Sequence, residues 1–303
     1  SRGTFRSKNK VGETMSFQTN SSNVTTFDPF VIFLPGLSDR VSWDLGEGGG
    51  YNATNLLTHI YPDGTTKTVT LRTNKLSNLN EFQANSDVII GNLDMSGWDN
   101  LGGSFYAHTN PSLTGITHTT STEVFNQYYV HNCGLVGNHD VSMFPNLGGM
   151  FLIYTNPLLT GITHGASTQT FSRYEANNCN LIGNHDMSML SGLGGVFRIE
   201  TNPLLTSITH TTSTEVFNQY DVYSCGLVGN HDMSMLPGLG GVFRIQSNPS
   251  LTSITHTAST ETFSIYKSNS CGLIGNHDMS MLPGLGGNFE VYFNPLLTSI
   301  THT

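Results

Sequence analysis

The chain has 303 residues, of which 37% are hydrophobic and only 11% are charged, and its formal net charge is −9. The hydrophobic share supports a large core and excludes a disordered chain, while twelve Lys and Arg leave no basic stripe for a nucleic-acid groove. No apolar run approaches the roughly 20 residues of a transmembrane helix, so the sequence predicts no membrane span.

Residues 1–26 are polar, and four of the twelve basic residues fall in the first ten positions: Arg2, Arg6, Lys8 and Lys10. Chain ends of this composition are usually solvated tails. We therefore expect an extended polar arm. Contact of its positive charge with nucleic acid or with an acidic partner is the alternative.

Residues 27–75 alternate β-forming residues with Gly-rich and Asp-Gly turns, which is typical of short antiparallel strands. Residues 43–48 read WDLGEG, His59 and Tyr61 form an HxY motif, and residues 68–71 read TVTL. These motifs resemble the PKD family, although Leu replaces Phe and Glu replaces Asp in the first turn. The resemblance implies a small, non-catalytic β-sandwich module that caps the N-terminal end of the following domain.

Residues 76–303 are dominated by internal repetition. A cysteine recurs every 46 residues, at Cys133, Cys179, Cys225 and Cys271, and an asparagine does so at Asn110, Asn156, Asn202, Asn248 and Asn294. Each period has two halves with similar apolar spacing. A central small or apolar residue therefore recurs every 23 residues, at positions 84, 107, 130, 153, 176, 199, 222, 245, 268 and 291. This predicts ten stacked coils, each with one short strand that is buried only against its neighbours.

One half of the period has apolar or small residues at Phe125, Tyr128, Val130, Cys133 and Leu135. This spacing resembles the leucine-rich repeat pattern LxxLxLxxN/CxL, and the other half follows it with small insertions. The resemblance implies a mainly β solenoid in which an Asn or Cys after each strand points inward. A buried Asn can bond the backbone of adjacent coils, and Cys fits the same small site. Cysteines two coils apart are separated by about 10 Å, which is too far for a disulfide.

An Asn-His-Asp motif also recurs every 46 residues, with its histidine at His139, His185, His231 and His277. The earliest copy has Leu93 instead, and a position that accepts leucine favours a buried structural imidazole. A pH-sensitive or ligand-contacting row is the alternative, and a metal site is disfavoured because copies about 10 Å apart cannot share an ion. We interpret a second series in the return segments in the same way: His118, His164, His210, His256 and His302.

The residues that flank each central position change freely between copies, whereas segments such as GNHDMSML hardly change. In a leucine-rich repeat these flanking residues face outward on the concave surface. Variation confined to one face suggests a surface diversified for binding, and random drift of exposed residues is the alternative. The predicted ligand-binding residues are Tyr106, His108, Tyr129, His131, Tyr154, Glu175, Asn177, Arg198, Glu200, Asp221, Tyr223, Arg244, Gln246, Lys267, Asn269, Glu290 and Tyr292. Their types suit contacts with glycans or proteins.

The sequence contains no nucleophile elbow, P-loop, dinucleotide fingerprint or paired catalytic carboxylates, so we expect no enzyme and no cofactor. A PKD-like module joined to near-identical, Asn- and Thr-rich repeats resembles surface proteins of flavobacteria and their phages. That resemblance implies an extracellular location, on a virion or a bacterial cell. The leading hypothesis is a virion spike, fibre or decoration protein that binds a host-surface glycan or protein. A bacterial adhesin is the second hypothesis and an ice-binding solenoid the third.

Residues 299–303 stop within a coil pattern, without a polar capping coil. The apolar face of the last coil would then be uncovered. We therefore expect other chains of a larger assembly to contact this chain, through the last coil or through the N-terminal arm.

Overall fold

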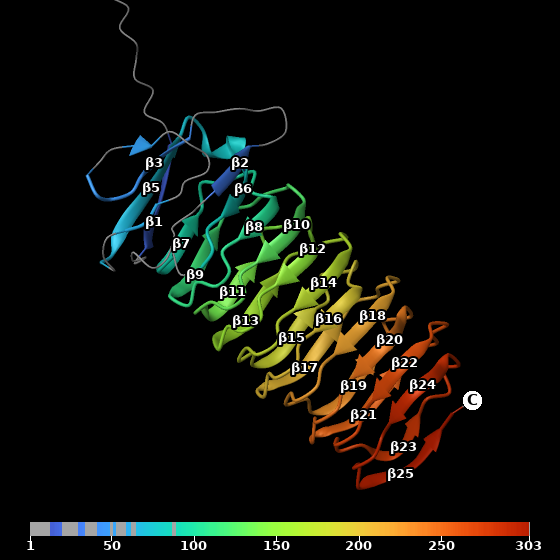
Figure 1. Ribbon diagram of the computed structural model, residues 1–303. Coiled ribbons are helices and arrows are strands. Elements are labelled where there is room, and N and C mark those ends of the chain that lie inside the picture. Colours follow the sequence, from blue (N-terminus) through green and yellow to red (C-terminus); the bar gives the residue numbers. More distant parts are fainter. Residues whose placement is uncertain are drawn as a thin grey trace, which may run out of the picture.

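The computed structural model describes residues 13–19, 30–33, 41–48, 51–52, 59–61, 65–86 and 89–302. The chain is a long stack of β coils with a small sheet at its N-terminal end (Figure 1). Within the described ranges, the 3-10 turn η1 (Leu76–Asn78) is the one helical segment. The fold is therefore a mainly β solenoid.

A long parallel sheet runs through the whole stack (Figure 1). Each predicted coil contributes one strand, and the strands pair in chain order: β6 (Leu79–Gln83), β8 (Gly103–Tyr106), β10 (Phe125–Tyr129), β12 (Leu147–Leu152), β14 (Phe171–Glu175), β16 (Gly195–Arg198), β18 (Phe217–Asp221), β20 (Leu239–Arg244), β22 (Phe263–Lys267) and β24 (Leu285–Glu290). Tyr128 pairs with Phe151, and Phe151 pairs with Tyr174, in steps of 23 residues. This register confirms the 23-residue coil.

A Gly-Gly pair begins every second strand and creates a bulge. Phe125 pairs with Leu147, but Gln127 pairs with Met150, so the second strand contains one extra residue. Gly149 has a φ of 61°, and a Cβ there would overlap the carbonyl oxygen of Asn126. Only glycine fits this conformation and this close approach.

The return segments form a second series of strands, which the sequence pattern did not predict. They pair in twos and in parallel: β7 (Gly91–Met95) with β9 (Leu113–His118), β11 (Val136–Val141) with β13 (Leu158–His164), β15 (Gly183–Met187) with β17 (Leu205–His210), β19 (Gly229–Met233) with β21 (Leu251–His256), and β23 (Ile274–Asp278) with β25 (Leu296–Thr301). The burial of these strands alternates, with His139 inside and its neighbours Asn138 and Asp140 outside. We call their exposed surface the paired-strand face.

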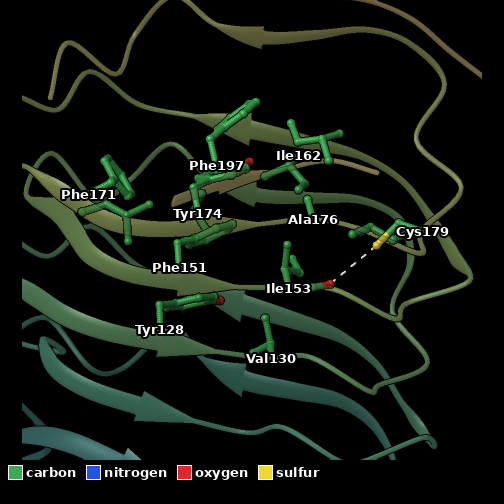
Figure 2. Close-up of a cluster of buried hydrophobic side chains, with 14 of the residues drawn as sticks. Tyr128, Val130, Phe151, Ile153, Ile162, Phe171, Tyr174, Ala176, Cys179 and Phe197 are labelled. Carbon is green, nitrogen blue, oxygen red and sulfur yellow. Dashed lines mark hydrogen bonds between the residues drawn. The ribbon is translucent and has the colours of Figure 1, made fainter. Parts of the chain in front are cut away.

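The core between the two strand series contains a column of aromatic rings, one from each coil. Tyr128, Phe151, Tyr174 and Phe197 stack at centroid separations of 5.3, 5.1 and 5.5 Å (Figure 2). Each ring is fully buried. Burying a ring of this size contributes roughly 2–3 kcal/mol relative to leaving it exposed, so the column supplies much of the driving force for stacking.

The N-terminal region forms a four-stranded antiparallel sheet in the order β1 (Glu13–Thr19), β5 (Lys67–Thr73), β3 (Ser42–Asp44) and β4 (Tyr51–Asn52). Strand β1 lies within the expected polar arm, so that part of the prediction was wrong. The alternate residues Met15, Phe17 and Thr19 are buried, and this period of two forms a strand despite the polar residues between them. Residues 1–12 and 20–26 of the expected arm lie outside the described residues.

Strand β2 (Phe30–Phe33) belongs to the long sheet rather than to the N-terminal sheet. It pairs antiparallel with β6 and covers the first edge of the solenoid. The backbone edge of β6 is therefore protected from pairing with another chain.

Candidate functional site

The strands of the long sheet direct alternate side chains away from the core. In the coil of β10, Tyr128 and Val130 are fully buried, whereas Gln127, Tyr129 and His131 are partly exposed. The same alternation recurs along the stack, so the outward positions form three columns. They stand three residues before, one before and one after each central residue. We call the surface made by these columns the long-sheet face.

The predicted ligand-binding residues occupy two of these columns, and most of them are partly exposed. Glu175 and Asp221 are the exceptions, because both are buried beneath neighbouring side chains. Tyr292, in the last coil, is 53% exposed. The face therefore contains accessible residues and two buried acids that are bonded to other side chains of the same chain.

The third column was missed by sequence reasoning. It includes Gln127, Met150, Arg173 and Gln219, which stand three residues before the central position and are partly exposed. The signal was available, because this column varies between copies as freely as the other two. The leucine-rich repeat pattern gives an outward position only to the residues next to the central one, so it assigns no role to this column.

Five aromatic side chains form one cluster in three consecutive coils of the long-sheet face. The rings of Tyr106 and Tyr129 lie 5.0 Å apart. His108 stacks on His131 at 4.6 Å with an interplanar angle of 7°, and His131 stacks on Tyr154 at 4.4 Å with an angle of 8°. The two rows also touch, since Tyr129 and His131 are 6.1 Å apart. We call these residues the five-ring cluster.

The five-ring cluster is uncharged at neutral pH. Burial, together with the neighbouring His108, lowers the pKa of His131 to about 4. Burial also lowers the pKa of His108 and raises the pKa of Tyr129 and of Tyr154. The His131 Nδ1 lies 3.0 Å from the Asn132 Nδ2 and accepts its hydrogen, so the ring carries its own proton on Nε2. The cluster thus presents neutral groups that both donate and accept hydrogen bonds.

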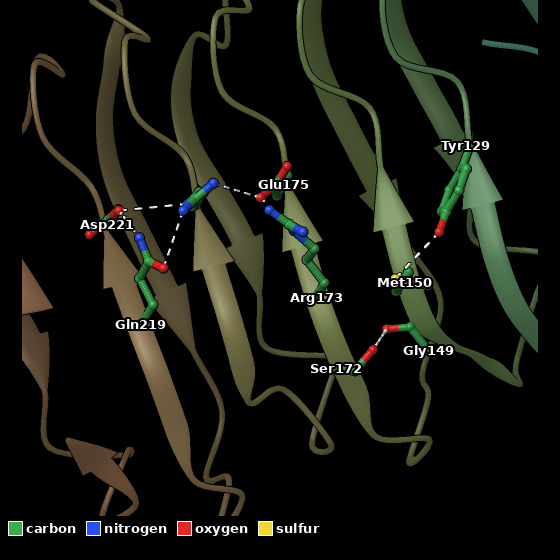
Figure 3. A network of polar contacts seen from close by, with 9 residues as sticks. Tyr129, Gly149, Met150, Ser172, Arg173, Glu175, Gln219 and Asp221 are labelled. Atoms are coloured by element: carbon green, nitrogen blue, oxygen red, sulfur yellow. Dashed lines mark hydrogen bonds and ion pairs between the residues drawn. The ribbon is translucent and has the colours of Figure 1, made fainter. Parts of the chain in front are cut away.

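Charged residues dominate the coils that follow (Figure 3). Glu175 Oε1 accepts from Arg173 Nε at 2.7 Å and from Arg198 at 3.1 Å. Asp221 Oδ2 accepts from Gln219 at 2.5 Å and from Arg244 at 3.2 Å. Arg198 also lies 3.7 Å from Asp221 and donates to Gln219. We call these six residues the arginine–acid network.

The arginine–acid network joins neighbouring coils. Burial raises the pKa of Asp221, while Gln219, Arg244 and Arg198 oppose that rise. Further along, Lys267 pairs with Glu290 at 2.9 Å. Because each buried acid is bonded to a cation or an amide of its own chain, this half of the face contributes interactions between coils.

Both histidine series converge on the buried tyrosines. Tyr128 Oη lies 2.8 Å from His118 Nε2 and 2.7 Å from His139 Nε2. The same triad recurs around Tyr174, Tyr220 and Tyr266, with distances of 2.8–3.0 Å. The structure thus places these histidines in the core.

Proton assignment in each triad follows from the remaining ring nitrogens. The Nδ1 atom of His118 is buried without a partner, and the equivalent atoms of His164, His210 and His256 are too. If Nε2 carries the proton, His118 donates to the tyrosine oxygen and Nδ1 remains only as an unpartnered acceptor. A proton on Nδ1 would instead bury an unpartnered N–H donor, so the first tautomer is favoured. The tyrosine hydroxyl then donates to Nε2 of His139. His302 differs, because its side chain is exposed.

The first coil replaces two members of this triad by apolar residues. Phe82 stands where Tyr128 stands, and Leu93 stands where His139 stands. Both side chains are fully buried. Where the tyrosine hydroxyl is absent, the imidazole at position 93 is absent too. The role of the imidazole is therefore to form a hydrogen bond with the buried hydroxyl.

The asparagines and cysteines bond backbone groups where each strand ends. Asn156 Nδ2 donates to Val130 O at 2.9 Å and to Ile153 O at 2.6 Å, and its Oδ1 accepts from Leu135 N at 3.3 Å. Cys179 reaches the carbonyl of Ile153 at 3.6 Å (Figure 2). All four cysteines are free and buried, and burial raises the pKa of Cys133, Cys179 and Cys225 to about 12. These thiols are unreactive core residues.

The paired-strand face is regular, and it combines polar bonds with exposed aliphatic residues such as Val136 and Ile182. Asn184 accepts from Ser207 at 2.9 Å and from Thr209 at 3.1 Å, and Asp186 accepts from the backbone N–H of Ser188. These contacts recur in the later copies. Between β13 and β15 the face has a cleft of about 300 Å³, lined in part by Ile182 and Met189.

Comparison of the chain with protein-family models, with curated proteins and with solved structures found no match. Among the described residues, no group of three or more His, Cys, Asp or Glu side chains could hold a metal ion. The described part of the chain also contains no helix that is long and apolar enough to cross a membrane. The fold and the face together define a β-solenoid with one variable surface.

Proposed function

We propose that this protein is a non-enzymatic recognition protein that binds a host-surface glycan or protein through the long-sheet face. Our first assignment is a virion spike, fibre or decoration protein. Its repeats would be leucine-rich repeats, in which the long-sheet face is the concave side. The observation that carries the proposal is that variation between copies is concentrated on this exposed face.

One column from each face illustrates the difference in variation between the long-sheet face and the paired-strand face. At intervals of 46 residues, the long-sheet face has Tyr129, Glu175, Asp221 and Lys267. The paired-strand face is also exposed, yet at the same interval it has Asn138, Asn184, Asn230 and Asn276. Drift of exposed residues would change both faces. Because change is concentrated on the long-sheet face, we infer that this face was diversified for recognition.

The N-terminal region supports the finer assignment. Trp43 is fully buried, Tyr61 Oη donates to the carbonyl of Leu45 at 3.0 Å, and His59 lies 3.1 Å from Glu47. The residues of the WDLGEG and HxY motifs therefore contact one another. We propose that they form a PKD-like module, which favours an extracellular surface protein of a flavobacterium or its phage.

Cell binding by matched variants tests the proposal. One variant combines Tyr154→Ala with Tyr223→Ala, two residues of the long-sheet face outside the arginine–acid network. The control combines Thr168→Ala with Thr214→Ala, two exposed connecting residues. We expect the parent and the control to bind a bacterial panel that includes flavobacteria, and the face variant to bind about tenfold or more weakly.

Two results would overturn the proposal: equal binding by both variants, or no binding of the parent to any cell or glycan. An antibody against the chain then separates the two surface assignments. Labelling of purified phage particles supports the virion protein, whereas labelling of bacterial cells alone supports an adhesin.

A further inference from the structure

We propose that the five-ring cluster is a subsite for a neutral, hydroxyl-rich ligand, an oligosaccharide without carboxylate or sulfate groups. This inference rests on the proposed function and narrows it to three coils of the long-sheet face. The cluster consists of Tyr106, His108, Tyr129, His131 and Tyr154. Four observations carry the assignment: rigidity, edge chemistry, absence of charge and restriction to these coils.

The rings are held in place before any ligand arrives. His131 is stacked on both sides, at 4.6 Å from His108 and 4.4 Å from Tyr154. Tyr129 is fixed by its ring contact with Tyr106 and by a hydroxyl bond to Met150 Sδ at 3.3 Å (Figure 3). Side chains that are already ordered lose little conformational entropy on binding, which favours affinity for a weakly interacting ligand.

The stacked arrangement determines which atoms a ligand meets. Rings that stack along the solenoid cover one another's faces, so their edges remain for contact. Those edges carry phenol hydroxyls and imidazole nitrogens beside aromatic C–H groups. A sugar has the same mixture, with hydroxyls that donate and accept next to apolar C–H patches. A row of such edges therefore matches a saccharide better than it matches a purely apolar segment.

The absence of charge in the five-ring cluster favours a neutral ligand over an acidic one. Both histidines of the cluster are neutral, as described above, so no imidazolium is present to pair with an anion. Arg173, whose charge acts on Tyr129 and Tyr154, is bonded to Glu175 at 2.7 Å. Arg198 and Arg244 are likewise paired with Glu175 and Asp221. An acidic glycan would have to disrupt these pairs to gain a cation.

The cluster is not required for folding in the way that the internal ring column is. The column of Tyr128 and Phe151 has a ring in each coil, and the rings from Phe82 to Tyr266 are fully buried. The five-ring cluster is partly exposed and is confined to three coils. At the equivalent positions of the next two coils the chain has Glu175, Asn177, Arg198 and Glu200. Residues required for packing of the coils would be expected in each coil, whereas a binding site needs only one location.

Binding of the full chain to neutral and acidic oligosaccharides tests this inference. The probes are neutral hexose oligomers of about four to eight units and the same backbones carrying sialic acid or sulfate. We expect binding to neutral members, with Tyr129→Ala plus His131→Ala raising Kd about tenfold or more. A second variant, Tyr223→Ala plus Lys267→Ala, alters the same face outside the cluster and should raise Kd less than the cluster variant does. The matched control, Thr168→Ala plus Thr214→Ala, alters two exposed connecting residues and should leave Kd within about twofold.

A milder variant keeps the ring. Tyr154→Phe removes one edge hydroxyl and retains the stack on His131, so we expect a smaller loss, of about threefold to tenfold. An unchanged Kd in this variant would contradict edge recognition.

Failure of the inference is distinguishable from failure of the proposed function. Preference for acidic glycans or for a protein ligand, or a loss of binding only in the Tyr223 and Lys267 variant, would overturn the subsite while leaving the long-sheet face as the proposed recognition surface. If neither pair of substitutions alters binding, both proposals fail. Circular dichroism and the unfolding midpoint verify that each variant is folded.

Discussion

At the residue scale, the buried tyrosines explain the conspicuous histidines of this chain. A hydroxyl enclosed in an apolar core must be hydrogen-bonded, and two imidazoles bond each one. The sequence placed the histidines at inward positions but did not identify their partner. The column alternates Tyr and Phe, and apolar patterning treats these two residues as equivalent. The joint change of Tyr128 to Phe82 and His139 to Leu93 was the available signal.

A double-mutant cycle tests this pairing. Tyr128→Phe leaves two buried imidazole nitrogens without partners and should lower the free energy of unfolding by about 2–4 kcal/mol. Adding His139→Leu reproduces the pair found in the first coil and should recover part of that loss. The coupling should reach about 1 kcal/mol in chemical unfolding. Additive losses would show that the hydroxyl and the imidazole do not depend on each other.

Acid should destabilise the chain through the same triads. Burial lowers the pKa of His139, His185, His231 and His277 to about 4, whereas an unfolded histidine titrates near about 6.5. The folded chain therefore binds fewer protons between these values. Its stabilisation is full above about pH 6.5 and is lost as the pH falls towards about 4.

At pH 5 each such histidine should reduce the free energy of unfolding by about 2 kcal/mol. We expect the urea unfolding midpoint to fall sharply between pH 7.5 and pH 5, and to fall less in a variant with His139→Leu. Equal midpoints at the two pH values would contradict neutral burial of the imidazoles.

At the element scale, the 23-residue strand spacing was predictable because each strand has a distinctive apolar pattern. The paired strands were not predicted. Their inward residues combine histidine with apolar residues, as in β15, where His185 and Met187 are buried, so no uniform hydrophobic period of two marks them. Their stability comes from tertiary contacts, namely the triads within the core and side-chain bonds such as Ser207 to Asn184. Strand β1 was missed because its buried residues are separated by polar ones.

The strand ends depend on the inward Asn and Cys residues. Asn156→Ala would leave Val130 O, Ile153 O and Leu135 N without their side-chain partners and should cost about 2–4 kcal/mol. Asn156→Cys should cost less, because Cys133 already reaches the equivalent carbonyl of Ala107 at 3.2 Å. Urea unfolding of the parent and the two variants checks this order. A cysteine variant no more stable than the alanine variant would contradict equivalence of the two residues.

At the scale of the whole molecule, the contacts that hold the coils together are separate from the long-sheet face, which we propose to be the recognition surface. The internal ring column, the triads and the Asn and Cys residues repeat along the solenoid and hold the coils in register. The long-sheet face is free to change around them. Its location could be inferred from sequence, because copies within one chain can be compared. Its division into the five-ring cluster and the arginine–acid network could not, because ring stacking and ion pairing depend on which coils lie side by side.

The most direct test of the central claim is steric blocking of one face at a time. The four native thiols are buried, and burial raises the pKa of Cys271 to about 11 and of the other three to about 12, so the parent should take up no maleimide. A single new cysteine can then carry a bulky maleimide, at Gln127→Cys on the long-sheet face or at Thr168→Cys on a connecting loop. We predict that the label at position 127 abolishes binding to target cells and that the label at position 168 leaves it intact. Equal binding by the two labelled proteins would contradict recognition through the long-sheet face.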